Sequence, residues 1–190
     1  MRIPHQLRCV ILEDARGATP DIRGMEQVGK AALPTPFLWG KMRVAPDQSL
    51  WALTYNLPLQ AGKPQYSPLF LRSLDQGHTW NVLGEINYQG DERVDSNAAK
   101  RDGFTEPDCN FRPDGSVICV MRTSDGFGHG PLYLARSKDG ARTWSKPVVF
   151  DRGFDGGKMP QLLTLDNGVT LAAYGQSGGP GYFAVRATSE

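Results

Sequence analysis

Two eight-residue segments, 73–80 and 137–144, share the pattern Ser-x-Asp-x-Gly-x-Thr-Trp, except that the second carries its glycine one place early. Repetition of one motif favours an array of similar units. The motif is typical of a tight turn, because an Asp side chain accepts hydrogen bonds from following backbone N–H groups and a glycine supplies a left-handed backbone step. The threonine begins a returning strand, and the tryptophan brings a large apolar surface for burial. The repeat therefore predicts a chain built from β-hairpins.

The same order of strand and turn signals recurs in three units, 41–88, 104–152 and 158–190. Residues 1–40 are unclear, apart from an expected strand over 6–12 and an expected loop or short helix over 14–29. The predicted strands are 41–45, 49–55, 69–73 and 80–86 in the first unit, 105–111, 116–122, 131–137 and 144–150 in the second, and 159–165, 169–174 and 181–188 in the third. Four antiparallel strands that recur every 40–50 residues or so are typical of a β-propeller blade. Three blades do not close a ring, so we expect either a fragment, cut inside a repeat after Glu190, or a chain that assembles with a second copy.

Composition excludes several classes of function. The 190 residues fit one domain, and a net charge of +1 with interspersed charges gives no reason to expect a nucleic-acid partner. There is no apolar run long enough for a signal peptide or a membrane span, so no membrane insertion is expected. A cytoplasmic location is the default expectation, with secretion as the alternative if the N-terminus is truncated.

The cysteines and histidines suggest neither a disulfide framework nor a metal site. Cys9, Cys109 and Cys119 are an odd number, although the last two flank a predicted turn and could lie near each other across the hairpin. We expect free, half-buried thiols. His5, His78 and His129 do not have the spacing of metal ligands, and no metal or organic cofactor is expected.

Topology predicts where a site would lie. In an antiparallel blade, the turn between strands one and two and the turn between strands three and four lie at the same end. In the second unit the opposite, open end then holds Glu106, Arg122 and the loop 124–130 with His129. A Glu and an Arg on adjacent strands either contribute to a functional site or form a structural ion pair, and the sequence leaves both interpretations open.

The repeated motif resembles the Asp box, or BNR repeat, of sialidases, and the segment 106–122 is similar to a sialidase segment with a Glu before a blade turn and an Arg after it. This resemblance implies an all-β, sialidase-type β-propeller of about three four-stranded blades, in which the Asp box is structural. It implies an exo-α-sialidase that hydrolyses terminal sialic acid with retention. Glu106 would draw the proton from a nucleophilic Tyr, and Arg122 and Arg186 would bind the sugar carboxylate.

Other parts of the sialidase pattern are incomplete. The letters Arg-Ile-Pro at residues 2–4 match a family motif but are out of register with the turn that should follow. Tyr174 is expected as a core or rim aromatic. The acid/base Asp has no clear counterpart, although Asp14, Asp21 and Asp91 are available, and the nucleophilic Tyr is expected beyond Glu190.

Two alternatives to a sialidase remain. One is a non-catalytic propeller that binds a carbohydrate or a protein, since the motif solves a folding problem by itself. The other is a propeller enzyme acting on different sugars, which would need two carboxylates at the open end, where only Glu106 is well placed. The expected partner is a sialoside or another glycan, or a protein under the first alternative, and no nucleic acid is expected. The open blade edges predict self-association.

Overall fold

The computed structural model describes residues 5–10, 27–33, 37–56, 65–123, 130–152, 157–176 and 183–188, almost entirely as strands and turns. The strands are β1 (His5–Val10), β2 (Gln27–Leu33), β3 (Phe37–Val44), β4 (Leu50–Asn56), β5 (Ser67–Ser73), β6 (Asn81–Glu85), β7 (Phe104–Phe111), β8 (Val117–Thr123), β9 (Leu132–Ser137), β10 (Val148–Asp151), β11 (Gly157–Thr164), β12 (Thr170–Gln176) and β13 (Phe183–Thr188). A single turn of 3₁₀ helix, Ala98–Lys100, precedes β7.

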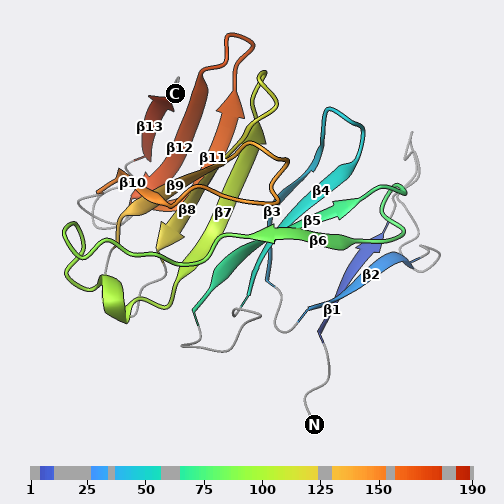
Figure 1. Ribbon diagram of the computed structural model, residues 1–190, viewed down its shortest axis with the longest axis horizontal. Coiled ribbons are helices and arrows are strands. Elements are labelled where there is room, and N and C mark those ends of the chain that lie inside the picture. Colours follow the sequence, from blue (N-terminus) through green and yellow to red (C-terminus); the bar gives the residue numbers. More distant parts are fainter. Residues whose placement is uncertain are drawn as a thin grey trace.

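The strands form consecutive antiparallel sheets, as expected for propeller blades. The first blade contains β3, β4, β5 and β6 in that order, the second contains β7 to β10, and the third contains β11, β12 and β13, while β1 and β2 pair separately. Figure 1 shows the blades side by side, with the turns β3–β4, β7–β8 and β11–β12 at one edge. The predicted all-β propeller fold is thus confirmed.

Two local predictions need correction. A strand was predicted over 144–150, but β10 begins only at Val148. Pro147 lacks the N–H that the ladder needs, so regular pairing starts after it. A loop or short helix was predicted over 14–29, yet 27–29 belong to β2, and 11–26 lie outside the described residues.

The two motif turns have the same hydrogen bonds despite their shifted glycines. In the first, the Asp75 carboxylate accepts from the Thr79 N–H at 2.8 Å and from its hydroxyl at 2.6 Å. In the second, Asp139 accepts from Thr143 at 2.9 and 2.6 Å. Two successive left-handed residues occur in both turns, Gln76–Gly77 and Gly140–Ala141, so the glycine can occupy either place.

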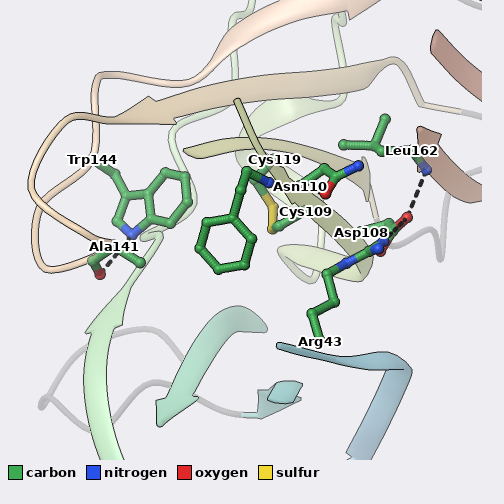
Figure 2. The surroundings of a disulfide bond; sticks show 9 residues. Arg43, Asp108, Cys109, Asn110, Cys119, Ala141, Trp144 and Leu162 are labelled. Atoms are coloured by element: carbon green, nitrogen blue, oxygen red, sulfur yellow. Dashed lines mark hydrogen bonds and ion pairs between the residues drawn. A yellow bond between two sulfur atoms is a disulfide. The ribbon is translucent and has the colours of Figure 1, made fainter. Parts of the chain in front are cut away.

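The first strands of the blades are joined by one buried carboxylate. Asp108, on β7, is 1% exposed. Arg43 on β3 donates from Nη2 to its two oxygens at 2.7 and 2.9 Å, and the Leu162 N–H on β11 donates to Oδ2 at 2.6 Å. Figure 2 shows these two partners reaching Asp108. Asp108 therefore connects all three blades.

Apolar side chains fill the spaces between neighbouring blades. Between the first and second blades, Phe70 packs on Trp144 with ring centroids 4.5 Å apart, and Trp51 packs on Phe111 at 4.7 Å. Between the second and third blades lie the buried side chains of Ile118, Val120, Leu132, Leu134, Leu162, Ala172 and Tyr174. The blades are thus held in a fixed relation to one another.

The expectation of free cysteine thiols is wrong for two of the three residues. Cys109 and Cys119 are directly opposite in the β7–β8 ladder and form a disulfide. Both are also fully buried instead of half-buried, at 4% and 0% exposure. Pairing across the hairpin, which the sequence left open, brings the two sulfur atoms together (Figure 2).

Candidate functional site

The candidate site lies at the end of the blades opposite the turns. Each first strand enters from this end and each second strand returns to it, so the beginnings of β3, β7 and β11 meet the ends of β4, β8 and β12. The motif turns lie at the other end. This open end is where the sequence placed Glu106 and Arg122.

A bulge recurs at the beginning of each first strand. The ladder register shifts between Trp39 and Arg43 in β3, between Thr105 and Asp108 in β7, and between Lys158 and Gln161 in β11. Each bulge contains one left-handed residue: Gly40 at φ 77°, Glu106 at 48° and Met159 at 52°. Bulges redirect side chains, and in the second blade the redirected side chain is the carboxylate of Glu106.

Glu106 and Arg122 form an ion pair at this end. Arg122 Nη1 donates to Glu106 Oε1 at 2.6 Å, and the Met159 N–H of the third blade donates to Oε2 at 2.9 Å. The two side chains are 11% and 18% exposed. Both carboxylate oxygens are thus held in place, one by the same blade and one by its neighbour.

The ladder register shows which residues are equivalent in the three blades. In the second blade, β8 begins at Val117, which pairs with Ser137 at the end of β9. Arg122 lies five residues after Val117. The corresponding strand beginnings, Leu50 and Thr170, place Tyr55 and Gly175 at the same position. The same position at the open end therefore carries a phenol in the first blade, a guanidinium in the second and no side chain in the third.

Tyr55 lies within the electrostatic range of the ion pair. Partial burial raises the pKa of the Tyr55 phenol, the Glu106 carboxylate adds to the increase, and Arg122 opposes it. A phenol with a raised pKa stays protonated at neutral pH and can donate a hydrogen bond.

Two further aromatic rings adjoin Tyr55. The Tyr66 ring centroid is 5.9 Å from that of Tyr55 in an edge-on arrangement, and the Trp39 centroid is 6.2 Å away. All three residues are partly exposed. We call Trp39, Tyr55 and Tyr66 the aromatic cluster.

Tyr66 is attached to the strand that carries Glu106. Its N–H donates to Asp102 O at 2.5 Å, and its carbonyl accepts from the Phe104 N–H at 2.8 Å. These bonds surround Gly103, where an added Cβ would overlap the Tyr66 backbone. A glycine at 103 therefore allows Tyr66 to approach β7.

The remaining predicted residues lie elsewhere or outside the described structure. Asp91 forms an ion pair with the exposed Arg93, with Arg93 Nη2 2.7 Å from Oδ2. Tyr174 is a core aromatic, as expected: it is 2% exposed and donates to Asp151. Arg186 lies opposite Ala172 in the middle of β13, and its side chain is not among those described, so its role stays a prediction. Residues 2–4, Asp14, Asp21 and His129 also lie outside the described ranges.

The sequence did contain a signal for Tyr55, although our prediction missed it. Tyr55 follows Ser49 by six residues, just as Arg122 follows Ser116 by six. Aligning the units on their turns identifies the two positions as equivalent. The convergence with Tyr66 had no such signal, because it depends on a bridge between segments 36 or more residues apart.

Within the described residues no group of three or more His, Cys, Asp or Glu side chains has the arrangement of a metal site. In that part of the chain no helix is long and apolar enough to cross a membrane.

Comparison with known proteins identifies the fold but not a family. No protein-family model matches the chain, and no curated protein sequence matches it. A protein of unknown function from Dyadobacter fermentans is similar in structure, with a TM-score of 0.62 and 23% identity over 82% of this chain and 38% of that one.

Two structures of characterised enzymes are also similar. The GH93 α-L-arabinofuranosidase of Fusarium graminearum, in complex with arabinobiose, has a TM-score of 0.62 and 16% identity over 88% of this chain and 52% of its own. The α-L-arabinanase of Penicillium chrysogenum, also with arabinobiose, has a TM-score of 0.59 and 16% identity over 80% and 46%. The chain thus spans about half the length of these structures, or less. Over that length it has the fold of propeller glycoside hydrolases.

Proposed function

We propose that this chain forms part of the substrate-binding face of a propeller glycoside hydrolase, with Glu106 as a catalytic residue and Arg122 as a substrate-binding residue. The observation that supports this most is the Glu106–Arg122 pair, which lies at the open end in a bulge that directs the carboxylate there. The similarity in fold to arabinan-degrading enzymes is consistent with the proposal.

The finer form of the proposal is retaining hydrolysis of terminal sialosides. The guanidinium of Arg122 would bind the sugar carboxylate through paired hydrogen bonds. Glu106 would accept a proton from a nucleophilic Tyr. Arg186 remains a candidate second contact to the carboxylate.

One observation favours a second candidate, a propeller that binds a glycan or a protein without hydrolysing it. Both oxygens of Glu106 already accept hydrogen bonds, from Arg122 and from the Met159 N–H. A carboxylate with both oxygens engaged is also what a structural ion pair requires.

The test measures sugar binding and stability together. Saturation-transfer NMR with 3′-sialyllactose and with arabinobiose would be recorded for the wild-type chain, Glu106→Gln and Arg122→Gln. If the two residues serve a site, binding weakens at least tenfold while the melting temperature changes by no more than about 4 °C. The exposed Arg93→Gln variant is the control and leaves both measurements unchanged.

The outcomes separate the candidates. Binding of sialyllactose alone, lost in Arg122→Gln, supports the sialoside form, whereas binding of arabinobiose contradicts it and keeps the broader class. A fall of more than about 10 °C in both variants, with sugar binding unaffected, identifies a structural ion pair and contradicts the proposal.

A further inference from the structure

The aromatic cluster at the open end has no role in the chemistry described so far. Tyr55 and Tyr66 come from different segments, the end of β4 and the residue that precedes β5, and their rings are arranged edge to face with centroids 5.9 Å apart. Both are partly exposed, whereas Phe70, which packs between the first and second blades, is fully buried. Tyr55 lies within the electrostatic range of Glu106 and Arg122, and Tyr66 lies next to it.

The backbone of Tyr66 packs closely against Gly103. The residue forms a parallel bridge to Gly103, whose φ is 115°. Only glycine adopts that conformation readily, and a side chain there would overlap the Tyr66 backbone. An arrangement that requires a specific glycine fixes Tyr66 relative to β7, and hence relative to Glu106 two residues after Phe104.

The equivalent positions of the three blades at the open end carry one charged pair. Glu106 and Arg122 form an ion pair at 2.6 Å. The positions equivalent to Glu106 are Gly40 and Met159, and those equivalent to Arg122 are Tyr55 and Gly175; none of these four residues is charged. The groups that these positions and the aromatic cluster offer a ligand include aromatic faces, phenol hydroxyls and one ion pair. Sugars match such a surface, since a sugar ring has an apolar C–H face that packs on an aromatic ring and hydroxyls around its edge.

We propose that Tyr55 and Tyr66 form a sugar-ring subsite next to Glu106, in which the rings contact the apolar face of a saccharide and the Tyr55 hydroxyl donates to one of its oxygens. The subsite rests on the proposed function, because it assumes that the open end takes a glycan. It goes further in assigning two contact residues. In this subsite the tyrosines would bind a sugar ring whether or not the sugar carries a carboxylate.

The direct test uses the wild-type chain with tyrosine rings labelled with ¹³C. Tyr55 and Tyr66 resonances, assigned with Tyr55→Phe and Tyr66→Phe, should shift on titration with arabinobiose or 3′-sialyllactose. Tyr88, Tyr133 and Tyr174 are internal controls, since Tyr133 and Tyr174 are fully buried and Tyr88 packs on Phe104 at 4.8 Å. Shifts confined to the controls, or absent from Tyr55 and Tyr66 while a sugar binds, would overturn the subsite.

Variants add a quantitative test. Tyr55→Leu and Tyr66→Leu should each weaken binding about tenfold, whereas Tyr66→Phe keeps the ring and should change it less than twofold. Leu74→Ala, at an exposed position in the first motif turn at the opposite end, is the matched control. If both leucine variants bind as the wild type does while Glu106→Gln does not, the subsite is wrong and the proposed function stands. If the wild-type chain binds neither sugar, both are overturned.

Discussion

Glu106 illustrates how a single backbone position combines structure and chemistry. Left-handed residues occur at the same place in all three blades, so the conformation belongs to the repeat and not to the site. The first blade uses glycine, which adopts this conformation without cost, whereas the second and third use Glu106 and Met159. The side chain that the second blade carries there is what distinguishes this blade as the candidate site.

Gly103→Ala should be strongly destabilising. The new methyl group would overlap the Tyr66 backbone, and alanine disfavours φ of 115°. We expect a loss of roughly 3 kcal/mol or more in the free energy of unfolding, from backbone strain and the displaced bridge. Urea denaturation followed by circular dichroism measures it.

Gly115→Ala is the matched control for that variant. Gly115 also has a positive φ, 80°, but nothing lies within 4 Å of an added Cβ. Its cost should be limited to the left-handed backbone, about 1–2 kcal/mol. Equal losses in the two variants would contradict the view that Gly103 is required by its contact with Tyr66.

At the level of elements, the two motif turns depend on ionised aspartates. Hydrogen bonds from the Thr79 hydroxyl and N–H lower the pKa of Asp75 to about 2, and those from Thr143 do the same for Asp139. In the unfolded chain the pKa of an Asp side chain is about 3.9. Because the pKa in the folded state is lower, the two carboxylates stabilise the fold fully above about pH 4, and this stabilisation is lost as the pH falls towards about 2.

Asp75→Asn with Asp139→Asn should therefore reduce the acid sensitivity of the fold. The double variant is expected to melt at a lower temperature than the wild type at pH 7, and the difference should shrink as the pH falls from about 4 to about 2. Melting curves recorded by circular dichroism at several pH values test this. Glu92→Gln, on an exposed loop, should leave the curve unchanged; a constant difference at every pH would contradict the assignment.

The tryptophan that ends the first motif contributes through burial. Trp80 is 8% exposed, and its indole N–H donates to the Gly77 carbonyl at 3.0 Å. Trp80→Ala should cost about 3–5 kcal/mol of stability, as expected for a buried aromatic side chain. Sugar binding by the folded fraction should be unchanged, because the motif lies at the end opposite the site.

The β7–β8 disulfide adds to the stability of the second blade. It closes a loop with a sequence separation of 10 residues. In the chain-entropy model such a loop contributes about 2–3 kcal/mol. Reduction, or Cys109→Ser with Cys119→Ser, should lower stability by that amount, and intact mass after alkylation in denaturant should show one free thiol before reduction and three after it.

At the scale of the whole molecule, the third blade presents an apolar surface on the side away from the second. Leu162 is buried against the second blade at 7% exposure, but its neighbour Leu163 is 57% exposed, and Leu165, at the following turn, is 38% exposed. Strands with apolar side chains on both faces are usually buried on both. This uncovered face is consistent with the predicted self-association.

We expect the 190-residue chain to self-associate through this face. Light scattering coupled to size exclusion should give a mass above that of one 20.9 kDa chain, and Leu163→Glu should shift it downwards. Leu74→Glu, at an exposed position in the first motif turn, serves as the control. A compact wild-type monomer would contradict the expectation.

The sequence by itself determined the local structure of this protein. Turn residues and alternating apolar strands depend on neighbours along the chain, so the repeats, most strands and the open end with Glu106 and Arg122 followed from residue types and spacing. Tertiary structure decided what depends on contacts between distant segments. Those are the disulfide, the Met159 N–H on Glu106, the Asp108 connection and the approach of Tyr66 to β7. Each joins groups whose separation is set by how the strands pair and pack, a geometry that no single segment encodes.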